Sequence, residues 1–169
     1  SAWQKVYYQY HYPKAEDFVW SQHTYITQFI RNFEISMYLP TFADTAKGYP
    51  HWLDVDSFVD FFLLNELTKN VDAYRLSTFM YKDRDSKGGK LVMGPVWDFN
   101  LGFGNCDYYN ASRVDGFHLA FLSDSLAFRG VDSYPAPFWW KTLLNDSSFR
   151  SKLSRRWTAG RRWATRPSS

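Results

Sequence analysis

The chain has 169 residues, 45% of them hydrophobic and 22% charged, which are ordinary proportions for one globular domain. Its formal net charge of +3 is too small to indicate a nucleic-acid-binding protein. The single cysteine, Cys106, excludes an internal disulfide, and it cannot build a zinc site without a histidine pair at ligand spacing. No apolar run reaches the roughly 20 residues of a membrane span, so we expect no membrane contact by this domain.

The N-terminal part of the chain predicts a strand, a long helix and a loop. Aromatic residues around Val6 indicate a strand over residues 3–12. Residues 15–39 have an apolar period of about 3.6 residues and predict a helix, with Glu16 and Asp17 in its first turn. The face that we expect to be buried consists of Phe18, Gln22, Ile26, Phe29, Ile30, Phe33 and Met37. A loop without a glycine-rich phosphate-binding turn follows it.

A second helix is predicted from Asp56 or Ser57 to about Lys69. Ser57 and Asp60 have the spacing of a capping box, and we expect Asp54 and Asp56 to act as capping residues rather than as metal ligands. The apolar face predicted for this helix consists of Phe58, Phe61, Phe62, Leu64 and Leu67. The loop that leaves the helix carries Asp72.

A β-hairpin is predicted directly after this loop. Residues 76–81 and 90–93 have strand character, and the polar loop between them contains two glycines. The step Gly94-Pro95 is expected to end regular strand pairing. Asp72 and Asp98 lie at the two ends of the hairpin, which brings its ends together. Two adjacent carboxylates indicate either a divalent cation or a shared proton, and the alternative is a role in turns or caps.

The last part of the chain predicts two helices after a stretch without a clear period. Residues 138–144 indicate a short helix, and Asp146 or Ser147 begins a final one. Phe149, Leu153 and Trp157 lie on one face of that final helix. Residues 150–166 contain seven basic residues and no acidic one. This basic face is either solvated or in contact with an acidic partner, an acidic domain of the same protein, or phosphate.

Several short segments in the same order closely resemble the CotH kinase family, the proteins similar to spore coat protein H. They are residues 54–58, 65–72, 81–83 and 94–100. The resemblance is strong over residues 49–105 and looser from residue 137 onward. It implies an α+β fold, the mostly helical large lobe of an atypical protein-kinase-like fold, in which a small β-hairpin carries the active-site loops. It also implies ATP with Mg²⁺ or Mn²⁺ as cofactors.

The resemblance assigns roles to individual positions. Asp72 matches the catalytic-loop aspartate, and Asp98 matches the metal-binding aspartate. Asn100 stands where some members have a second aspartate, and Ser77 stands where a metal-binding asparagine is expected. Both departures predict weaker metal binding. Arg75, three residues after Asp72, is a further candidate that either steadies a phosphate or offsets the local negative charge.

The activity implied by the family is phosphorylation of Ser or Thr in partner surface or coat proteins, at the bacterial cell surface, outside the cell or in the spore coat. No glycine-rich loop or strand-borne lysine precedes the catalytic stretch. We therefore expect residues 1–169 to be a single domain, the larger lobe of a longer protein, with little kinase activity by itself.

Two other functions are open at this point. One is a catalytically inactive surface or spore-coat module with a structural or binding role, which Ser77, Asn100 and the aromatic content of 21% favour. The other is a metal-dependent hydrolase that uses the same two carboxylates, which ranks last because the sequence offers no base to activate its nucleophile. The oligomeric state is not indicated by the sequence.

Overall fold

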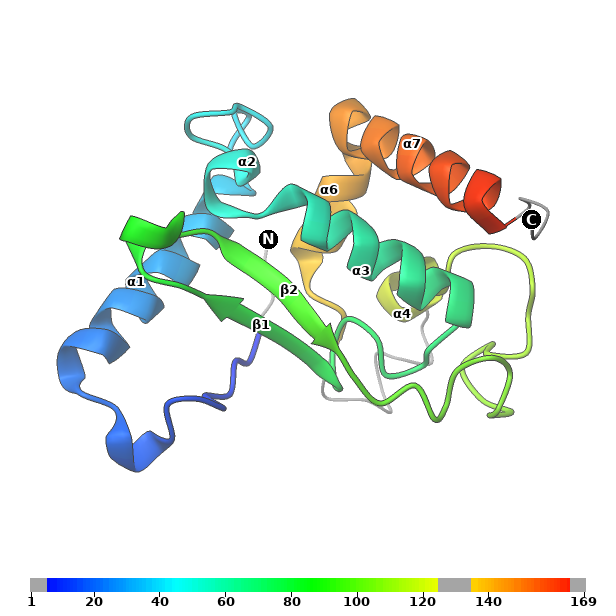
Figure 1. The fold of residues 1–169 in the computed structure, drawn as a ribbon, viewed down its shortest axis with the longest axis horizontal. Helices are drawn as coiled ribbons and strands as arrows, with labels where there is room; N and C mark the ends of the chain where they lie inside the picture. Colours follow the sequence, from blue (N-terminus) through cyan, green and yellow to red (C-terminus); the bar gives the residue numbers. More distant parts are fainter. Residues whose placement is uncertain (1–5, 125–134, 165–169) are drawn as a thin grey trace. The chain divides into compact units, whose positions relative to one another are not determined.

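The computed structural model describes residues 6–124 and 135–164. The chain divides into two compact units, residues 1–52 and 53–169. The regular secondary structure of the described residues consists of helices and one two-stranded antiparallel sheet, which confirms the α+β class (Figure 1). None of the described helices has the length and apolar character needed to cross a membrane. The assignment of the chain to the larger lobe of a longer protein remains a prediction.

The first unit is built around α1 (Trp20–Ser36), which is preceded by the 3-10 turn η1 (Ala15–Asp17) and followed by α2 (Tyr49–Trp52). The long helix begins later than predicted because Val19 has extended backbone angles and is its N-cap. Glu16 and Asp17 therefore lie in η1 and not in the first turn of the helix. Of the face predicted to be buried, Phe33 and Met37 are buried, and the other members are half-buried or, for Gln22, exposed.

The strand predicted for residues 3–12 is wrong over the part that is described, since residues 6–12 have no regular secondary structure. Residues 3–5 lie outside the described ranges. The aromatic side chains of this segment interact with the following residues instead. The Tyr8 hydroxyl donates to Glu34 Oε1 at 2.8 Å, and the Tyr10 ring lies 4.3 Å from that of Phe18. Strand character in the sequence therefore does not by itself make a strand, because tertiary contacts override it.

The second unit is organised around α3 (Val55–Thr68). Asp54 is its N-cap and accepts a hydrogen bond from the Ser57 amide at 2.9 Å. The capping role of Asp54 is confirmed, whereas the capping box of Ser57 with Asp60 is wrong because the helix begins earlier. Phe58, Phe61 and Phe62 are buried as predicted. The predicted burial of Leu67 is wrong, because this residue, in the last turn of the helix, is 58% exposed.

The hairpin consists of β1 (Thr78–Lys82) and β2 (Leu91–Val96), joined by a loop that contains η2 (Asp85–Lys87). Tyr81 pairs with Val92, and pairing continues past Pro95 to the pair Thr78–Val96. Regular pairing is therefore interrupted at Gly94-Pro95, as predicted, although the strand continues to Val96. The register is irregular between Thr78 and Met80, and an irregularity of this kind allows a proline within a strand.

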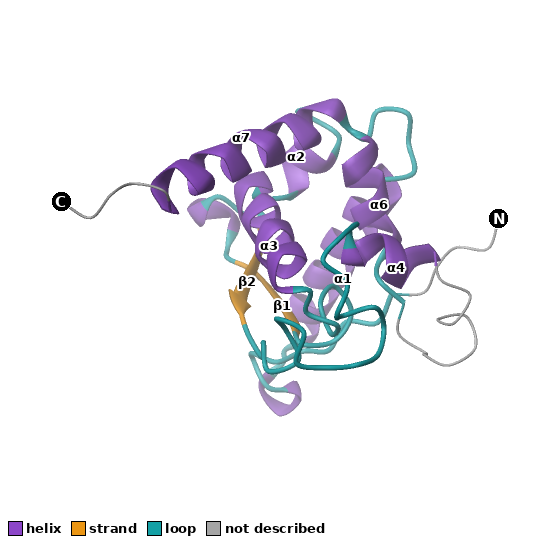
Figure 2. Cartoon of the chain, turned by 90° about the vertical axis from the view of Figure 1, so that its right-hand side faces the viewer, coloured by secondary structure: helices purple, strands orange, loops and turns teal. Residues whose placement is uncertain are grey.

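The remaining helices are α4 (His118–Asp124), α6 (Phe138–Asn145) and α7 (Ser147–Ala164). Asp146 Oδ2 accepts from the Phe149 amide at 3.0 Å, which confirms the predicted start of the last helix. Helix α3 contacts β2 on one side and α7 on another, so it lies between them (Figure 2). The core of this unit is an aromatic cluster whose rings are in mutual contact: Phe58, Phe61, Phe62, Tyr74, Trp139 and Trp140.

Candidate active site

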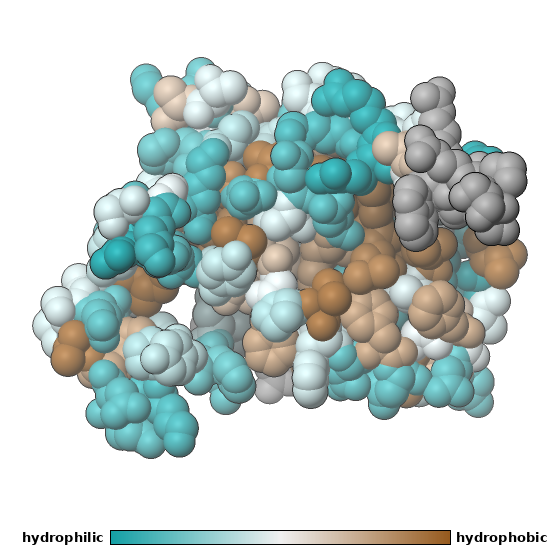
Figure 3. All heavy atoms as spheres, in the orientation of Figure 1, coloured by the Kyte–Doolittle hydropathy of each residue, from teal (hydrophilic) through white to brown (hydrophobic). Residues whose placement is uncertain are grey.

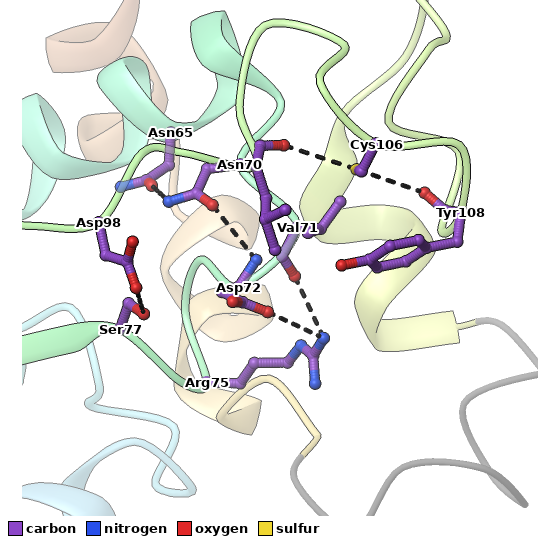
Figure 4. A network of polar contacts seen from close by, with 10 residues as sticks. Asn65, Asn70, Val71, Asp72, Arg75, Ser77, Asp98, Cys106 and Tyr108 are labelled. Atoms are coloured by element: carbon purple, nitrogen blue, oxygen red, sulfur yellow. Dashed lines mark hydrogen bonds and ion pairs between the residues drawn. The ribbon is translucent and has the colours of Figure 1, made fainter.

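The loop that carries Asp72 is held by two buried asparagines. Helix α3 ends where Lys69 takes a left-handed backbone conformation with φ of 51°. Asn70 Nδ2 donates to Asn65 Oδ1 at 3.4 Å, and Asn70 Oδ1 accepts from the Asp72 amide at 3.3 Å (Figure 4). Asn65 is anchored in turn to the Phe61 carbonyl at 2.9 Å. The backbone at Asp72 is therefore fixed by amides that are themselves excluded from water.

Arg75 lies beside Asp72. Its Nη2 is 3.7 Å from Asp72 Oδ1 and donates to the Val71 carbonyl at 3.2 Å. The Arg75 side chain is 1% exposed and that of Asp72 is 23% exposed. The carboxylate therefore reaches solvent, while the cation next to it is enclosed by protein. This arrangement keeps a positive charge close to Asp72, where it offsets part of the negative charge of the carboxylate.

Asp98 lies at the other end of the hairpin and contacts Ser77. Ser77 Oγ donates to Asp98 Oδ2 at 3.1 Å, beside the last strand pair, Thr78–Val96. Asp98 is exposed and has a left-handed backbone conformation, with φ of 60°. Its carboxylate is thus presented to solvent from a strained position that the hairpin end imposes.

The structure brings the predicted site residues together as two pairs, Asp72 with Arg75 and Asp98 with Ser77 (Figure 4). Asn100 is exposed, and its carbonyl accepts from Asn105 Nδ2 at 2.7 Å, which closes the loop after β2. No hydrogen bond joins its side chain to Asp98 within the described residues. These residues also hold no cluster of three or more His, Cys, Asp or Glu side chains able to bind a metal. A cation shared by Asp72 and Asp98 stays a prediction.

The segment between β2 and α4 is attached to the Asp72 loop at several points. The Arg75 guanidinium carbon lies 5.4 Å from the centre of the Tyr109 ring. Lys69 Nζ donates to the Gly116 carbonyl. The buried Glu66 carboxylate accepts from the amides of His118 and Leu119 at 2.6 Å and 2.9 Å. The position of this segment is therefore set by α3 and by the residues that follow it.

Comparison with known protein families shows to which family the chain belongs. Residues 1–164 match the family described as CotH kinase protein. The chain belongs to the CotH kinase family. Neither the search of curated proteins nor that of solved structures gave a match. The resemblance inferred from short segments is thereby confirmed, and it extends beyond residues 49–105 to almost the whole chain.

In this CotH family member, the negative charge of Asp72 affects the pKa of two side chains in the segment after β2. Partial burial raises the pKa of the Cys106 thiol, and the carboxylates of Asp107 and Asp72 raise it further. Desolvation and then Cys106 and Asp72 raise the pKa of Tyr108. The thiol and the phenol therefore remain protonated at neutral pH and lie in the field of the predicted catalytic carboxylate.

Apolar side chains gather over the end of α3 and the loops after β2 (Figure 3). The Phe103 amide donates to the Thr68 carbonyl, which brings the loop onto the last turn of α3. The Phe117 ring lies 5.7 Å from that of the buried Phe62. We use the name apolar surface for the exposed apolar residues of the last turn of α3 and of the loops between β2 and α4 that are Leu67, Trp97, Phe103, Val114 and Phe117. A surface of this kind commonly marks a site of protein contact.

Sequence reasoning had assigned no role to several residues that organise this CotH site. They are Asn65, Glu66, Asn70 and Tyr109. The two asparagines flank the end of the predicted helix, where buried amides often hold an irregular loop, so their spacing carried a signal. Glu66 and Tyr109 had none, because the contacts by which they organise the site, Glu66 with His118 and Leu119 and Tyr109 with Arg75, join residues 34 to 53 positions apart.

Proposed function

We propose that this CotH kinase-family chain takes part in the transfer of the γ-phosphoryl group of ATP to a Ser or Thr hydroxyl of a partner protein. The proposal is carried by one observation. In a chain of this family, Asp72 and Asp98 flank a hydrogen-bonded hairpin and both reach solvent. Two carboxylates at adjoining loops are the minimum that phosphoryl transfer needs for orienting an acceptor and holding a metal.

Asp98 is the residue that we assign to the metal. Its carboxylate is exposed, and Ser77 holds one of the two oxygens, which leaves the other free to bind a cation. Mg²⁺ is usually bound by one or two carboxylates together with phosphate oxygens and water, so this donor set fits it. When bound, such an ion neutralises charge on the phosphates.

We assign to Asp72 the role of orienting the acceptor hydroxyl and accepting its proton. The hydroxyl oxygen forms a bond to the γ-phosphorus while the bond from that phosphorus to the β–γ bridging oxygen breaks, and ADP leaves. The hydroxyl proton passes to the Asp72 carboxylate. Arg75 Nη2 lies 3.7 Å from this carboxylate, and Asn70 Oδ1 accepts from the Asp72 amide at 3.3 Å, which orients the backbone that carries it. Arg75 is thus a positioning residue in the proposal.

The partner is proposed to be a surface or coat protein that contacts the apolar surface. This surface lies on the segments that lead away from Asp72 and Asp98, and its exposed aromatic rings suit a polypeptide ligand. The location that we propose for this activity is the bacterial cell surface, the outside of the cell or the spore coat.

The test is to titrate ATP with Mg²⁺ or Mn²⁺ into the full-length protein and to measure phosphoryl transfer from labelled ATP to acid-extracted surface or spore proteins. Asp98→Ala should weaken nucleotide binding by at least about tenfold. Asp72→Asn should keep binding and lower transfer by about 10²- to 10⁴-fold. The matched control Asp83→Asn, in the hairpin loop, should change neither. Unchanged nucleotide binding by Asp98→Ala would end the assignment.

An inactive binding module is the second candidate. It is favoured by Ser77 and Asn100, which stand where an asparagine ligand and, in some members, a second aspartate are expected. The Ser77 hydroxyl donates to Asp98, and the Asn100 carbonyl accepts from Asn105. The same experiment separates the two functions. Capture of a surface or coat protein without metal or nucleotide, together with no transfer of label, would favour the binding module.

A further inference from the structure

The start of α1 carries aromatic rings that hold one another in place. The Tyr10 hydroxyl lies 3.4 Å from Thr27 Oγ1, within hydrogen-bonding distance. The Tyr10 ring is 4.3 Å from that of Phe18 and 5.7 Å from that of His23. The segment before the helix is thereby fastened along α1, so these rings have defined positions within the first unit.

Trp20, the first residue of α1, lies next to this set of rings. Its indole is stacked on the His23 imidazole, with 5.5 Å between the ring centres and 12° between the ring planes. Trp20 is nevertheless 80% exposed. One face of the indole is therefore supported by His23, and the other is open to water. A flat apolar ring that is already held in one orientation loses little entropy when a ligand covers it.

The surroundings of Trp20 on the helix are polar but uncharged. Residues 18–30 contain no Asp, Glu, Lys or Arg. Thr24, Thr27 and Gln28 share a helix face with Trp20 at the spacings i+4, i+7 and i+8, and all three are exposed. We call these four residues the Trp20 platform, which extends about 12 Å along the helix axis.

We propose that the Trp20 platform binds a neutral oligosaccharide of β-1,4-linked pyranose rings. In such a ring the equatorial substituents leave axial C–H groups on both faces, and these weakly positive groups pack on the negative face of an indole. The sugar hydroxyls at the ring edge both donate and accept hydrogen bonds, as do the threonine hydroxyls and the glutamine amide.

The charge distribution selects this occupant. An acidic or basic partner would find its nearest countercharges in the sequence at Arg31 and Asp17, beyond the two ends of the uncharged stretch. An extended apolar partner fits less well, because the indole is followed along the platform by hydroxyls and an amide. The platform belongs to the first unit, and sugar binding there does not require Asp72 or Asp98.

The test measures binding of cellohexaose and of chitohexaose to the whole chain by isothermal titration calorimetry. At least one of them should bind, and the one that binds more tightly identifies a glucan or an N-acetylglucosamine polymer as the source. The affinity should stay within about twofold between low and high salt, because no charge pair is formed.

Two substitutions test the roles of the platform residues. Trp20→Ala should weaken binding by at least about tenfold, because the sugar loses the apolar surface that it covers. Trp20→Tyr keeps a smaller ring and should weaken binding less. Thr24→Val has nearly the same shape without the hydroxyl and should weaken binding by a few-fold.

The matched control is Trp157→Ala, which removes a tryptophan that is 43% exposed on α7, in the second unit. It should leave the affinity within about twofold. If circular dichroism shows that Trp20→Ala does not fold, Trp20→Tyr and Thr24→Val replace it. The proposal would be overturned by a lack of binding of both oligosaccharides, by wild-type affinity in the platform variants or by equal weakening in the control. Binding that falls steeply with salt, or tighter binding of polygalacturonate through Trp20, would overturn it as well.

Discussion

At the scale of single residues, backbone strain collects around the candidate site. Left-handed conformations at non-glycine residues occur, within the described ranges, only between residues 69 and 110: Lys69, Tyr74, Asp98, Phe103, Tyr109 and Asn110. Such conformations cost about 1 kcal/mol or more each and persist where surrounding contacts impose them. Here the contacts are the Asn65–Asn70 pair, the Glu66 carboxylate and the end of the hairpin.

The strain at Asp98 gives a prediction that separates stability from function. Asp98→Gly removes the carboxylate and supplies a residue that tolerates a φ of 60°. The free energy of unfolding should stay the same or rise by up to about 1 kcal/mol, while binding of ATP with Mg²⁺ is lost. Urea unfolding and nucleotide titration measure the two effects. A large loss of stability would instead assign Asp98 a mainly structural role.

His118 gives a prediction on pH. Burial, followed by the charges of Lys69 and Arg75, lowers the pKa of His118 from 6.5 to about 4. Between these values the unfolded chain binds a proton that the folded protein does not. The resulting stability is complete above about pH 6.5 and is lost as the pH falls to about 4.

Replacement of His118 by phenylalanine should therefore flatten the decrease in unfolding free energy between pH 7 and pH 4. The part of the decrease that His118 causes is at most about 3.4 kcal/mol, since its pKa is lowered from 6.5 to about 4 and each pKa unit corresponds to about 1.4 kcal/mol. The hydrogen bond to Glu66 is donated by the backbone amide of residue 118, so the substitution retains it. The control His51→Phe should keep the slope of the wild-type protein. Identical slopes for all three proteins would show that His118 does not titrate across this range.

At the scale of elements, the loops after β2 are placed by α3 rather than by their own sequence. Lys69, Arg75 and Glu66 contact residues 116, 109 and 118–119 of this segment. The segment thereby acquires a defined position although it contains few residues in regular structure. Its exposed aromatic residues are consequently presented on a supported backbone, which lowers the entropy lost on binding a partner.

A substitution in this segment tests its proposed contact with substrate. Phe103→Ser removes an aromatic ring that is 77% exposed, so the fold should be affected by less than about 0.5 kcal/mol. The KM for a protein substrate should rise about tenfold, with kcat and nucleotide binding nearly unchanged. The control is Tyr81→Ser on β1, which is also exposed. Equal KM values for the two variants would remove the apolar surface from the substrate site.

At the scale of the whole molecule, the second unit depends on one aromatic cluster. Trp140 is 0% exposed, and its ring lies within 6.2 Å of those of Phe58, Phe61, Phe62, Tyr74 and Trp139. These residues come from α3, from the loop with Asp72 and from α6. The cluster therefore joins the helix that supports the site to the helix before α7.

A pair of tryptophan substitutions tests this dependence. Trp140→Ala should lower the free energy of unfolding by about 3–5 kcal/mol, because it leaves a large cavity in a buried cluster. Trp157→Ala should lower it by less than about 1.5 kcal/mol, since 43% of that side chain is already exposed. Guanidinium unfolding followed by circular dichroism measures both. Similar losses in the two variants would show that the cluster is not the dominant source of stability.

The sequence by itself determined the elements whose cause is local. The apolar period of α3, the two strands with glycines between them, and the start of α7 at Asp146 depend on residues a few positions apart. The family followed from short segments in a fixed order. The placement of Asp72 and Asp98 at the two ends of the hairpin was likewise predictable, because a hairpin follows from its strands and turn.

Tertiary structure alone decided which of these residues meet. Residues 6–12 have strand character but no regular secondary structure, and Leu67 was predicted on the buried helix face yet is exposed. The contacts of Ser77 with Asp98, of Arg75 with Tyr109 and of Glu66 with the start of α4 join residues 21, 34 and 52 positions apart. Periodicity and capping extend over a few residues only, whereas packing selects contacts between distant ones, so no local pattern could supply them.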